Sequence, residues 1–139
     1  MSEPSRVDVK WVGEHLFDFG REGRPSARID GDGATAPSSV DALLGALGSC
    51  VSYDVVDILA KRRTPVESLE VEVVARRVDT IPRHLEHVTL NFSIAGKGIE
   101  RPHAERAVGL AVTKYCSVRS SLRPDVPVVW TIALASETE

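Results

Sequence analysis

Apolar and polar residues alternate along the first third of the chain, which predicts short β-strands joined by turns. Residues 7–12 alternate as a half-buried strand does, and residues 16–19 follow a plausible tight turn at Gly13 and Glu14. Residues 27–29 predict a third short strand, which the following Gly-Asp-Gly sequence ends.

The next segment carries the strongest helix signal, beginning after Pro37 and running to about residue 62. Ser38 is a good N-cap residue, and Asp41 lies three positions later, as in a capping box. Gly45 and Gly48 thin the middle of this helix at a cost of about 1 kcal/mol each, which suggests that another backbone or a ligand approaches closely. The predicted apolar stripe consists of Val40, Leu43, Leu47, Val51, Val55 and Ile58.

Two longer strands are expected at residues 69–78 and 88–94, with a hairpin between them. A second helix begins near Arg101, breaks near Cys116 and continues as a short helical piece. Residues 126–134 form a closing strand. This order of elements predicts an α+β fold with helices on one face of a largely antiparallel sheet.

Length and charge narrow the class of protein. The 139 residues are enough for one domain, expected over residues 1–139. With 17 Lys and Arg against 20 Asp and Glu, the formal net charge is −3, which argues against a nucleic-acid binder that neutralises phosphates. No run of about 18 apolar residues is apparent, and the N-terminus lacks the apolar segment of a signal peptide. We therefore expect a cytoplasmic protein with no membrane and no nucleic-acid partner.

Cys50 and Cys116 are the two cysteines of the chain, and each falls on or at the end of a predicted helix. Structural disulfides are rare in the cytoplasm, so these are either two inert core residues or one reactive pair. If the helices are neighbours, one thiolate could attack a peroxide O–O bond and the second thiol could condense with the sulfenic acid. An external thiol would then restore the pair. The spacing alone leaves both interpretations open.

Asp54 lies near the middle of the predicted apolar stripe, four residues after Cys50, where a carboxylate needs a partner. It is either a group that orients an arginine or binds a ligand near Cys50, or half of a salt bridge across a subunit interface. A functional role needs a cation, because an unpaired carboxylate would disfavour the Cys50 thiolate. The candidate cations are Arg21, Arg24, Arg28, Lys114 and Arg119.

His84 and His87 have a metal-like spacing, but they lie in a loop-to-strand region without a third ligand. The Gly-Asp-Gly sequence at residues 31–33 lacks the lysine of a phosphate-binding loop. We expect no metal and no cofactor.

Residues 36–50, APSSVDALLGALGSC, form a small-residue helix that is led by a proline and ends in Cys50. Residues 114–118, KYCSV, surround the second cysteine. These segments resemble the two cysteine sites of the OsmC/Ohr family, and the order of strands and helices resembles that family over about residues 5–135. Residues 50–59 look closest to the small OsmC-like subgroup of redox proteins.

The resemblance implies an intertwined homodimer in which antiparallel sheets wrap two long central helices, with active sites at the dimer interface. It also implies that Cys50 is the peroxidatic and Cys116 the resolving cysteine of a peroxidase. Peroxidase members carry a Glu just after the helix-opening proline and an Arg in the N-terminal strands. Here the nearest acid is Asp41, Arg21 resembles the arginine site locally, and Ser117 stands where those members usually have Pro.

The leading hypothesis is a thiol peroxidase of oxidative-stress defence that reduces organic hydroperoxides, with hydrogen peroxide as a second candidate substrate. Cys50 and Cys116 would react, Arg21 and Asp41 would support them, and a thiol or dithiol would reduce the pair. The incomplete Arg/Glu set motivates an alternative, a binding or sensing module with a small-molecule pocket at the dimer interface, for which Asp54 is a ligand-binding candidate. A third interpretation is a structural dimer with two inert thiols.

Overall fold

The computed structural model describes residues 2–137 and divides the chain into two compact units. The first unit ends at Leu43 and the second begins at Leu44. The long helix α1 (Ser39–Lys61) therefore starts in the first unit and continues in the second. That the whole chain forms one domain stays a prediction.

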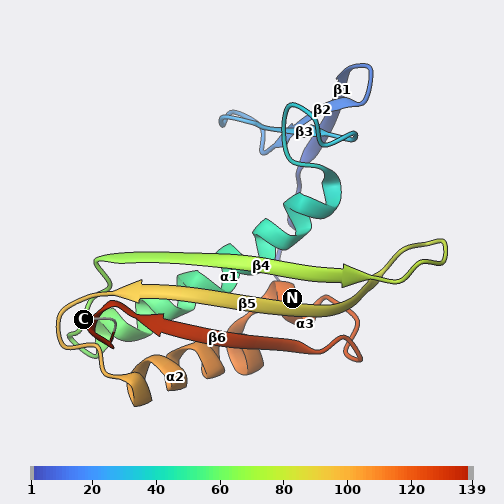
Figure 1. Ribbon diagram of the computed structural model, residues 1–139. Helices are drawn as coiled ribbons and strands as arrows, with labels where there is room; N and C mark the ends of the chain where they lie inside the picture. Colours follow the sequence, from blue (N-terminus) through green and yellow to red (C-terminus); the bar gives the residue numbers. More distant parts are fainter. Residues whose placement is uncertain (1, 138–139) are drawn as a thin grey trace. The chain divides into compact units, whose positions relative to one another are not determined.

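The first unit contains the small antiparallel sheet that the alternating pattern indicated (Figure 1). Gly13 and Glu14 have φ values of 119° and 48°, so the predicted tight turn lies where the backbone is left-handed. The predicted strands are confirmed within one residue of their expected ends. They are β1 (Asp8–Gly13), β2 (Leu16–Gly20) and β3 (Ala27–Asp30), in that order in the sheet.

This sheet has little cover within its own unit. Asp30 is the only buried residue in the described range 2–43, and Val9 and Trp11 remain 66% and 64% exposed. The expectation of a half-buried first strand is therefore not met within the first unit by itself, because no second layer in this unit packs on the strand. Small sheets of this kind need another layer to be stable in water.

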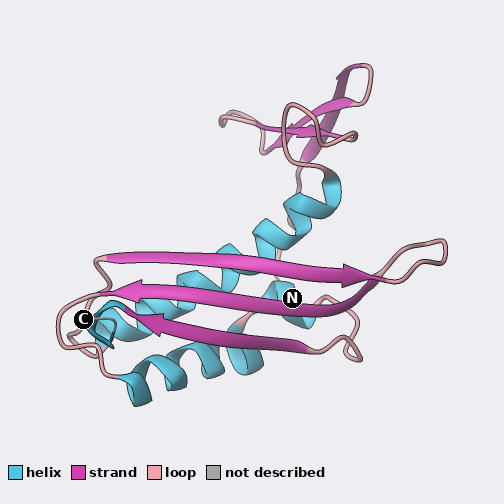
Figure 2. Cartoon of the chain, in the orientation of Figure 1, coloured by secondary structure: helices cyan, strands magenta, loops and turns pink. Residues whose placement is uncertain are grey.

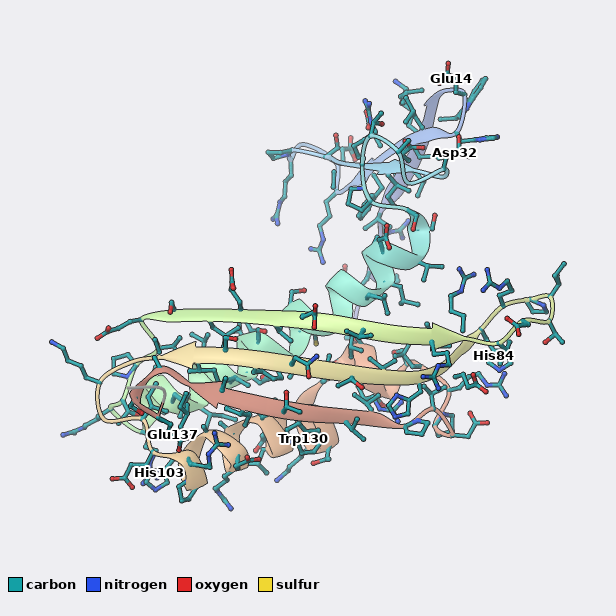
Figure 3. All side chains as sticks on the ribbon, viewed as in Figure 1. Glu14, Asp32, His84, His103, Trp130 and Glu137 are labelled. Carbon is teal, nitrogen blue, oxygen red and sulfur yellow. The ribbon has the colours of Figure 1, made fainter. Side chains whose placement is uncertain are left out.

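The Asp30 carboxylate organises the loop between β3 and α1. It accepts hydrogen bonds from the backbone N–H groups of Asp32, Ala34 and Thr35 at 2.9, 3.2 and 2.9 Å, and from the Thr35 hydroxyl at 2.9 Å. These hydrogen bonds, led by the one from the Thr35 N–H, hold the pKa of Asp30 below its usual value. Asp32, labelled in Figure 3, in turn pairs with His15 at 3.0 Å, and this contact raises the pKa of His15.

Helix α1 begins with the predicted capping box. The Ser38 hydroxyl oxygen accepts a hydrogen bond from the Asp41 N–H at 3.1 Å, and the Asp41 carboxylate accepts one from the Ser38 N–H at 3.0 Å. The helix ends at Lys61, one residue before the expected end, and Arg63 just beyond it takes a left-handed φ of 70°.

The buried face of α1 is rotated slightly from the predicted stripe. Leu59 is buried where Ile58 was expected, and Leu43 is 38% exposed. Asp54 therefore does not lie at the centre of the buried face and is only half-buried. The buried apolar residues of the helix are Leu47, Val51, Val55 and Leu59.

By length and composition alone, α1 is apolar enough to cross a membrane. Its most apolar window has a mean hydropathy of 1.5, and 28% of that window is buried within the chain. The sequence analysis expected no segment apolar enough to cross a membrane, and by mean hydropathy this expectation is wrong. A core helix of a soluble protein meets the same criterion, and the buried stripe of α1 is what such a helix shows.

The second unit contains a sheet of β4 (Ser68–Arg77), β5 (Leu85–Ala95) and β6 (Val128–Leu134), in that order (Figure 1). β4 and β5 form the predicted antiparallel hairpin, whereas β6 pairs with β5 in parallel, with Val128 opposite Val88. Parallel neighbours need a long crossover connection. The sequence did not anticipate the parallel pairing.

Helical segments, drawn in cyan in Figure 2, make this crossover. They are α2 (Arg101–Leu110), the π-helical turn η1 (Ala111–Tyr115) and α3 (Ser117–Ser120). The expected break at Cys116 is confirmed. α1 and α2 lie on the same face of the sheet, over a core of aliphatic side chains and Phe92. The largest fully buried side chains in the described part of the chain are Phe92, Leu47, Leu59, Leu90, Val51, Val55, Val88 and Val108.

Arg101 fastens the start of the crossover to the end of β6. Its guanidinium donates to the Ile132 carbonyl at 2.8 Å and to the Glu137 carboxylate at 2.6 to 3.0 Å. Glu137 belongs to the short helix η2 (Ala135–Glu137), and its pKa is lowered by the hydrogen bond from Arg101. Figure 3 labels Glu137 and His103 at this end of the unit.

Gly48 lets α1 approach β4 closely. A Cβ at this position would lie 3.0 Å from Val73 Cγ2 and 3.3 Å from Val71 Cγ1, closer than ordinary contact. At Gly45, by contrast, a Cβ would have no such neighbour within 4 Å in the described chain. The close approach expected from the glycines is therefore present at Gly48, where two valine side chains of β4 in the same unit lie against the helix.

We expect Gly48→Ala to lower the free energy of unfolding, because the added methyl must displace two valine side chains. Gly109→Ala in α2 is the matched control, since its Cβ would lie 3.8 Å from Trp130, an ordinary contact. That variant should gain up to about 1 kcal/mol from the better helix propensity of alanine. Urea unfolding at one fixed protein concentration compares them, and equal stabilisation of both variants would contradict a tight contact at Gly48.

Candidate functional site

Cys50 lies in the middle of α1, two residues after the helix meets β4 at Gly48. It is half-buried and lies at the edge of the buried stripe, beside the fully buried Val51. This is the position that the helical wheel predicts. The packing of α1 on the sheet therefore sets how deep the Cys50 sulfur lies.

Cys116 follows a change in helical pitch. In η1 the hydrogen bonds span five residues, and the Cys116 N–H bonds to the Ala111 carbonyl at 2.9 Å. Such π turns are rare and frequently occur at functional sites. The backbone of Cys116 is then extended, with φ −73° and ψ 107°, so the helix stops and Cys116 becomes the N-cap of α3. Its sulfur accepts a hydrogen bond from the Arg119 N–H at 3.3 Å.

The two thiols lie close enough for Cys50 to influence the titration of Cys116. Both cysteines are free, and Cys116 is 3% exposed. Burial is the main cause that raises the pKa of the Cys116 thiol, and Cys50 raises it further through a hydrogen bond and through its charge. The backbone N–H groups of Arg119 and Val118 act in the opposite direction. The balance favours a protonated Cys116 that can donate a hydrogen bond to the Cys50 sulfur.

Arg119 holds the segment around Cys116 in two ways. Its backbone N–H contacts the sulfur, and its guanidinium donates to the carbonyls of Arg123 and Val126 at 3.2 and 2.8 Å. These bonds tie the end of the crossover to the segment that leads into β6. Arg119 thus links the Cys116 sulfur to the segment that leads into β6.

A pocket of about 510 Å³ opens beside Cys116, entirely within the second unit. Its apolar lining includes Leu122, Pro124 and Val128, and two cationic residues, Lys114 and Arg119, also line it. Lys114 lies with its ammonium 5.4 Å from the centre of the Tyr115 ring. No carboxylate lines the pocket.

The family described as OsmC-like protein matches residues 31–131, which include both cysteines and the crossover. The chain belongs to the OsmC-like protein family. The resemblance of the two cysteine segments to that family is therefore confirmed, as is the α+β fold class.

Three known proteins are similar to this chain. Protein YhfA of Escherichia coli K12 is 36% identical over 121 residues, which cover 86% of this chain and 90% of YhfA. A solved structure from Psychrobacter arcticus, titled as a putative osmotic stress induced and detoxification response protein, has a TM-score of 0.81 at 16% identity and covers 96% of this chain and 98% of its own. The organic hydroperoxide resistance protein OhrB of Bacillus subtilis has a TM-score of 0.62 at 13% identity, with 94% and 98% covered. At such identities the two structures show the fold.

The other residues singled out in this OsmC-like sequence fall into two groups. Arg21 and Asp41 belong to the first unit, where Arg21 is exposed after β2 and the Asp41 carboxylate caps α1. Arg28 is paired with Asp18. In the second unit, the Asp54 carboxylate makes no hydrogen bond or ion pair with any other residue in the range 2–137. Supporting roles for Arg21, Asp41 and Asp54 at the thiols stay predictions.

Sequence reasoning missed two features of the OsmC-like site, the π turn and the contact of the Arg119 backbone with the sulfur. The π turn has no residue signature, because residues 101–115 read as one continuous helical pattern. The sequence carried a weak signal for the contact between the Arg119 backbone and the Cys116 sulfur, because a helix that restarts after Cys116 needs a capping side chain. Cysteine is not among the preferred caps, so its position was not read as one.

In the Cys50→Ser variant, we expect iodoacetamide to alkylate Cys116 slowly at neutral pH in the native protein. Burial raises the pKa of Cys116, so the rate should keep rising with pH beyond the range in which an exposed thiol has fully ionised. Urea should remove the difference. The Cys116→Ser variant, which reports on Cys50 alone, is the control. Native alkylation of Cys116 as fast as in urea at neutral pH would contradict this view of the site.

Proposed function

We propose that this chain is a thiol-dependent peroxidase that reduces organic hydroperoxides through Cys50 and Cys116 in oxidative-stress defence, with hydrogen peroxide as a second substrate. The observation that carries the proposal is that the half-buried Cys50 thiol interacts with the buried Cys116 thiol, whose pKa is raised. Membership of the OsmC-like family supports a general peroxide-resistance or redox role. The Bacillus subtilis protein of similar fold is named for organic hydroperoxide resistance.

The chemistry assigns one step to each sulfur. The Cys50 thiolate attacks the distal oxygen of the hydroperoxide, the O–O bond breaks, and the other oxygen leaves as an alcohol after taking a proton. Cys50 is thereby oxidised to a sulfenic acid. The Cys116 sulfur, having lost its proton, then attacks the Cys50 sulfur, and water leaves as the disulfide forms.

The environments of the two sulfurs support this order. The thiolate is the attacking form, and burial raises the pKa of Cys116 and so disfavours its thiolate. As long as Cys116 keeps its proton, its S–H can donate to the Cys50 thiolate and stabilise it. Cys50 therefore attacks first and Cys116 resolves.

Arg21 and Asp41 are proposed as the supporting pair. A guanidinium would favour the Cys50 thiolate and polarise the peroxide, since charge-assisted hydrogen bonds are about twice as strong as neutral ones. Asp41 would orient the arginine in addition to capping α1. Because Asp54 has no polar partner among residues 2–137, it remains available as a group that contacts a ligand near Cys50.

We further propose that the protein is a homodimer. Apolar or small side chains on one face of α1 lie uncovered by the rest of the second unit, at the spacing of one helix face: Ser49, Tyr53, Val56 and Ala60. Tyr53 is 73% exposed and Val56 is 43% exposed. The first unit also has no apolar core of its own among the described residues. A second copy would cover both surfaces, which a single chain leaves in water at a cost of about 25 cal/mol per Å².

The OsmC-like fold is that of a soluble protein, in which α1 serves as a core helix and not as a membrane span. We infer that the protein acts in the cytoplasm, where an unpaired and reduced state of both thiols is the ordinary one.

When reduced protein is mixed with cumene hydroperoxide without oxygen, we expect intact mass spectrometry to show loss of two hydrogens and peptide mapping to show a Cys50–Cys116 disulfide. Cys116→Ser should stop at an oxidised Cys50, and Cys50→Ser should leave Cys116 unmodified. An unchanged wild-type mass would overturn the peroxidase proposal. If small apolar or thiol ligands then raised the melting temperature, the binding-module alternative would be favoured instead.

The same assay tests Arg21 against a matched neighbour. Arg21→Ala should slow disulfide formation by about 10-fold or more, as expected for losing a cation that stabilises developing charge. Arg24→Ala, the same change three residues away on the exposed turn, should leave the rate unaltered. Equal rates for both variants would remove Arg21 from the proposed site.

For the dimer, we expect Val56→Glu to produce monomers in analytical ultracentrifugation, because it puts a charge on the uncovered face of α1. Val129→Glu is the matched control, since Val129 is 44% exposed on β6 and Val56 is 43% exposed on α1. The control should sediment as wild type. A wild-type protein that is monomeric at micromolar concentration would contradict the proposal.

A further inference from the structure

The pocket beside Cys116 has an electrostatic character that the peroxidase reaction does not use. Two cationic residues line it, Lys114 and Arg119, and no carboxylate does, although the whole chain has a formal net charge of −3. Neither of these cations forms a salt bridge with any residue in the range 2–137. The pocket is therefore a locally positive surface on an acidic protein, with apolar side chains and one sulfur in its wall.

We propose that this pocket binds an anionic small-molecule thiol, which reduces the Cys50–Cys116 disulfide by attacking the sulfur of Cys116. The proposal rests on the proposed function, because it concerns the return of the oxidised pair to the dithiol. The Lys114 ammonium, exposed at the pocket, meets the anionic group of the ligand. Leu122 and Val128 contact its carbon chain.

The direction of attack follows from access and from the leaving group. Cys116, and not Cys50, lines the pocket, so a thiol held there reaches the Cys116 sulfur. Attack on Cys116 expels Cys50, whereas attack on Cys50 would expel Cys116, whose pKa is raised by burial. Thiol–disulfide exchange is faster when the departing sulfur has the lower pKa. Both considerations select Cys116 as the sulfur that is attacked.

The step balances with two molecules of thiol. The first thiolate bonds to the Cys116 sulfur as the Cys50–Cys116 bond breaks, and Cys50 leaves as a thiolate. A second thiolate then attacks the sulfur of the first thiol in this mixed disulfide. The two thiol molecules leave as a symmetrical disulfide, and together they have lost two electrons to the protein. Cys116 departs as a thiolate and takes up a proton.

The test uses wild-type protein oxidised to the disulfide with diamide, so it does not depend on hydroperoxide turnover. Three two-carbon thiols that differ in charge serve as probes: 2-mercaptoethanesulfonate, 2-mercaptoethanol and cysteamine. Rates are compared per thiolate at low and high salt. We expect the anionic thiol to react about 10-fold faster than the neutral one at low salt, with cysteamine slowest, and the differences to shrink as salt rises.

Two further measurements locate the site. Lys114→Gln should abolish the preference for the anionic thiol, whereas Lys97→Gln, an exposed lysine in the loop after β5, should keep it. In a rapid quench with N-ethylmaleimide, peptide mapping should find the probe on Cys116 and the maleimide on Cys50. The probe on Cys50, or equal rates for the three thiols on wild-type protein, would overturn the proposal. The two proposals can fail separately. If the disulfide made with diamide is reduced as expected but cumene hydroperoxide forms no disulfide, the proposed peroxidase function fails and the assignment of this pocket stands.

Discussion

The contact between α1 and β4 at Gly48 is the constraint on which the site depends. The missing side chain lets the helix settle on the two valines of the strand, and Cys50 follows two residues later on the same helix. A side chain at this position would press on the valine methyl groups that the helix packs against. Close packing in protein interiors leaves little room for these methyl groups to move. The depth of the Cys50 sulfur therefore depends on the lack of a side chain at Gly48.

The position of the Cys116 sulfur depends on a different feature, the π turn η1. The π turn before Cys116 shifts the hydrogen-bond pattern by one residue, and the extended backbone of Cys116 ends the helix there. Arg119 then holds the restarted chain through one backbone and two side-chain hydrogen bonds. A regular helix continued through residue 116 would present a different side chain to α1. The irregularity interrupts the helix, and it places the Cys116 sulfur where Cys50 influences its titration.

Much of this architecture could be predicted from the sequence, because local signals determine it. The capping box of Ser38 and Asp41, the alternating strands and the break near Cys116 each depend on residues close in the chain. The parallel pairing of β6 could not be predicted, since alternation along a strand carries no information about the direction of its neighbour. The partner of Gly48 escaped prediction for the same reason. A glycine in a helix indicates a close neighbour, but only the fold identifies that neighbour.

The parallel pairing of β5 and β6 has a consequence for the order in which the second unit assembles. The β4–β5 hairpin closes a short loop, whereas β6 can join only after residues 96–127 have crossed over the sheet. Pairings between distant residues form late, because the entropy of closing the loop must be lost before the contacts are gained. Cys116 lies inside this crossover, so its sulfur reaches Cys50 among the last events of folding. The topology thus keeps the two thiols of a nascent chain apart until the structure that controls their reactivity is in place.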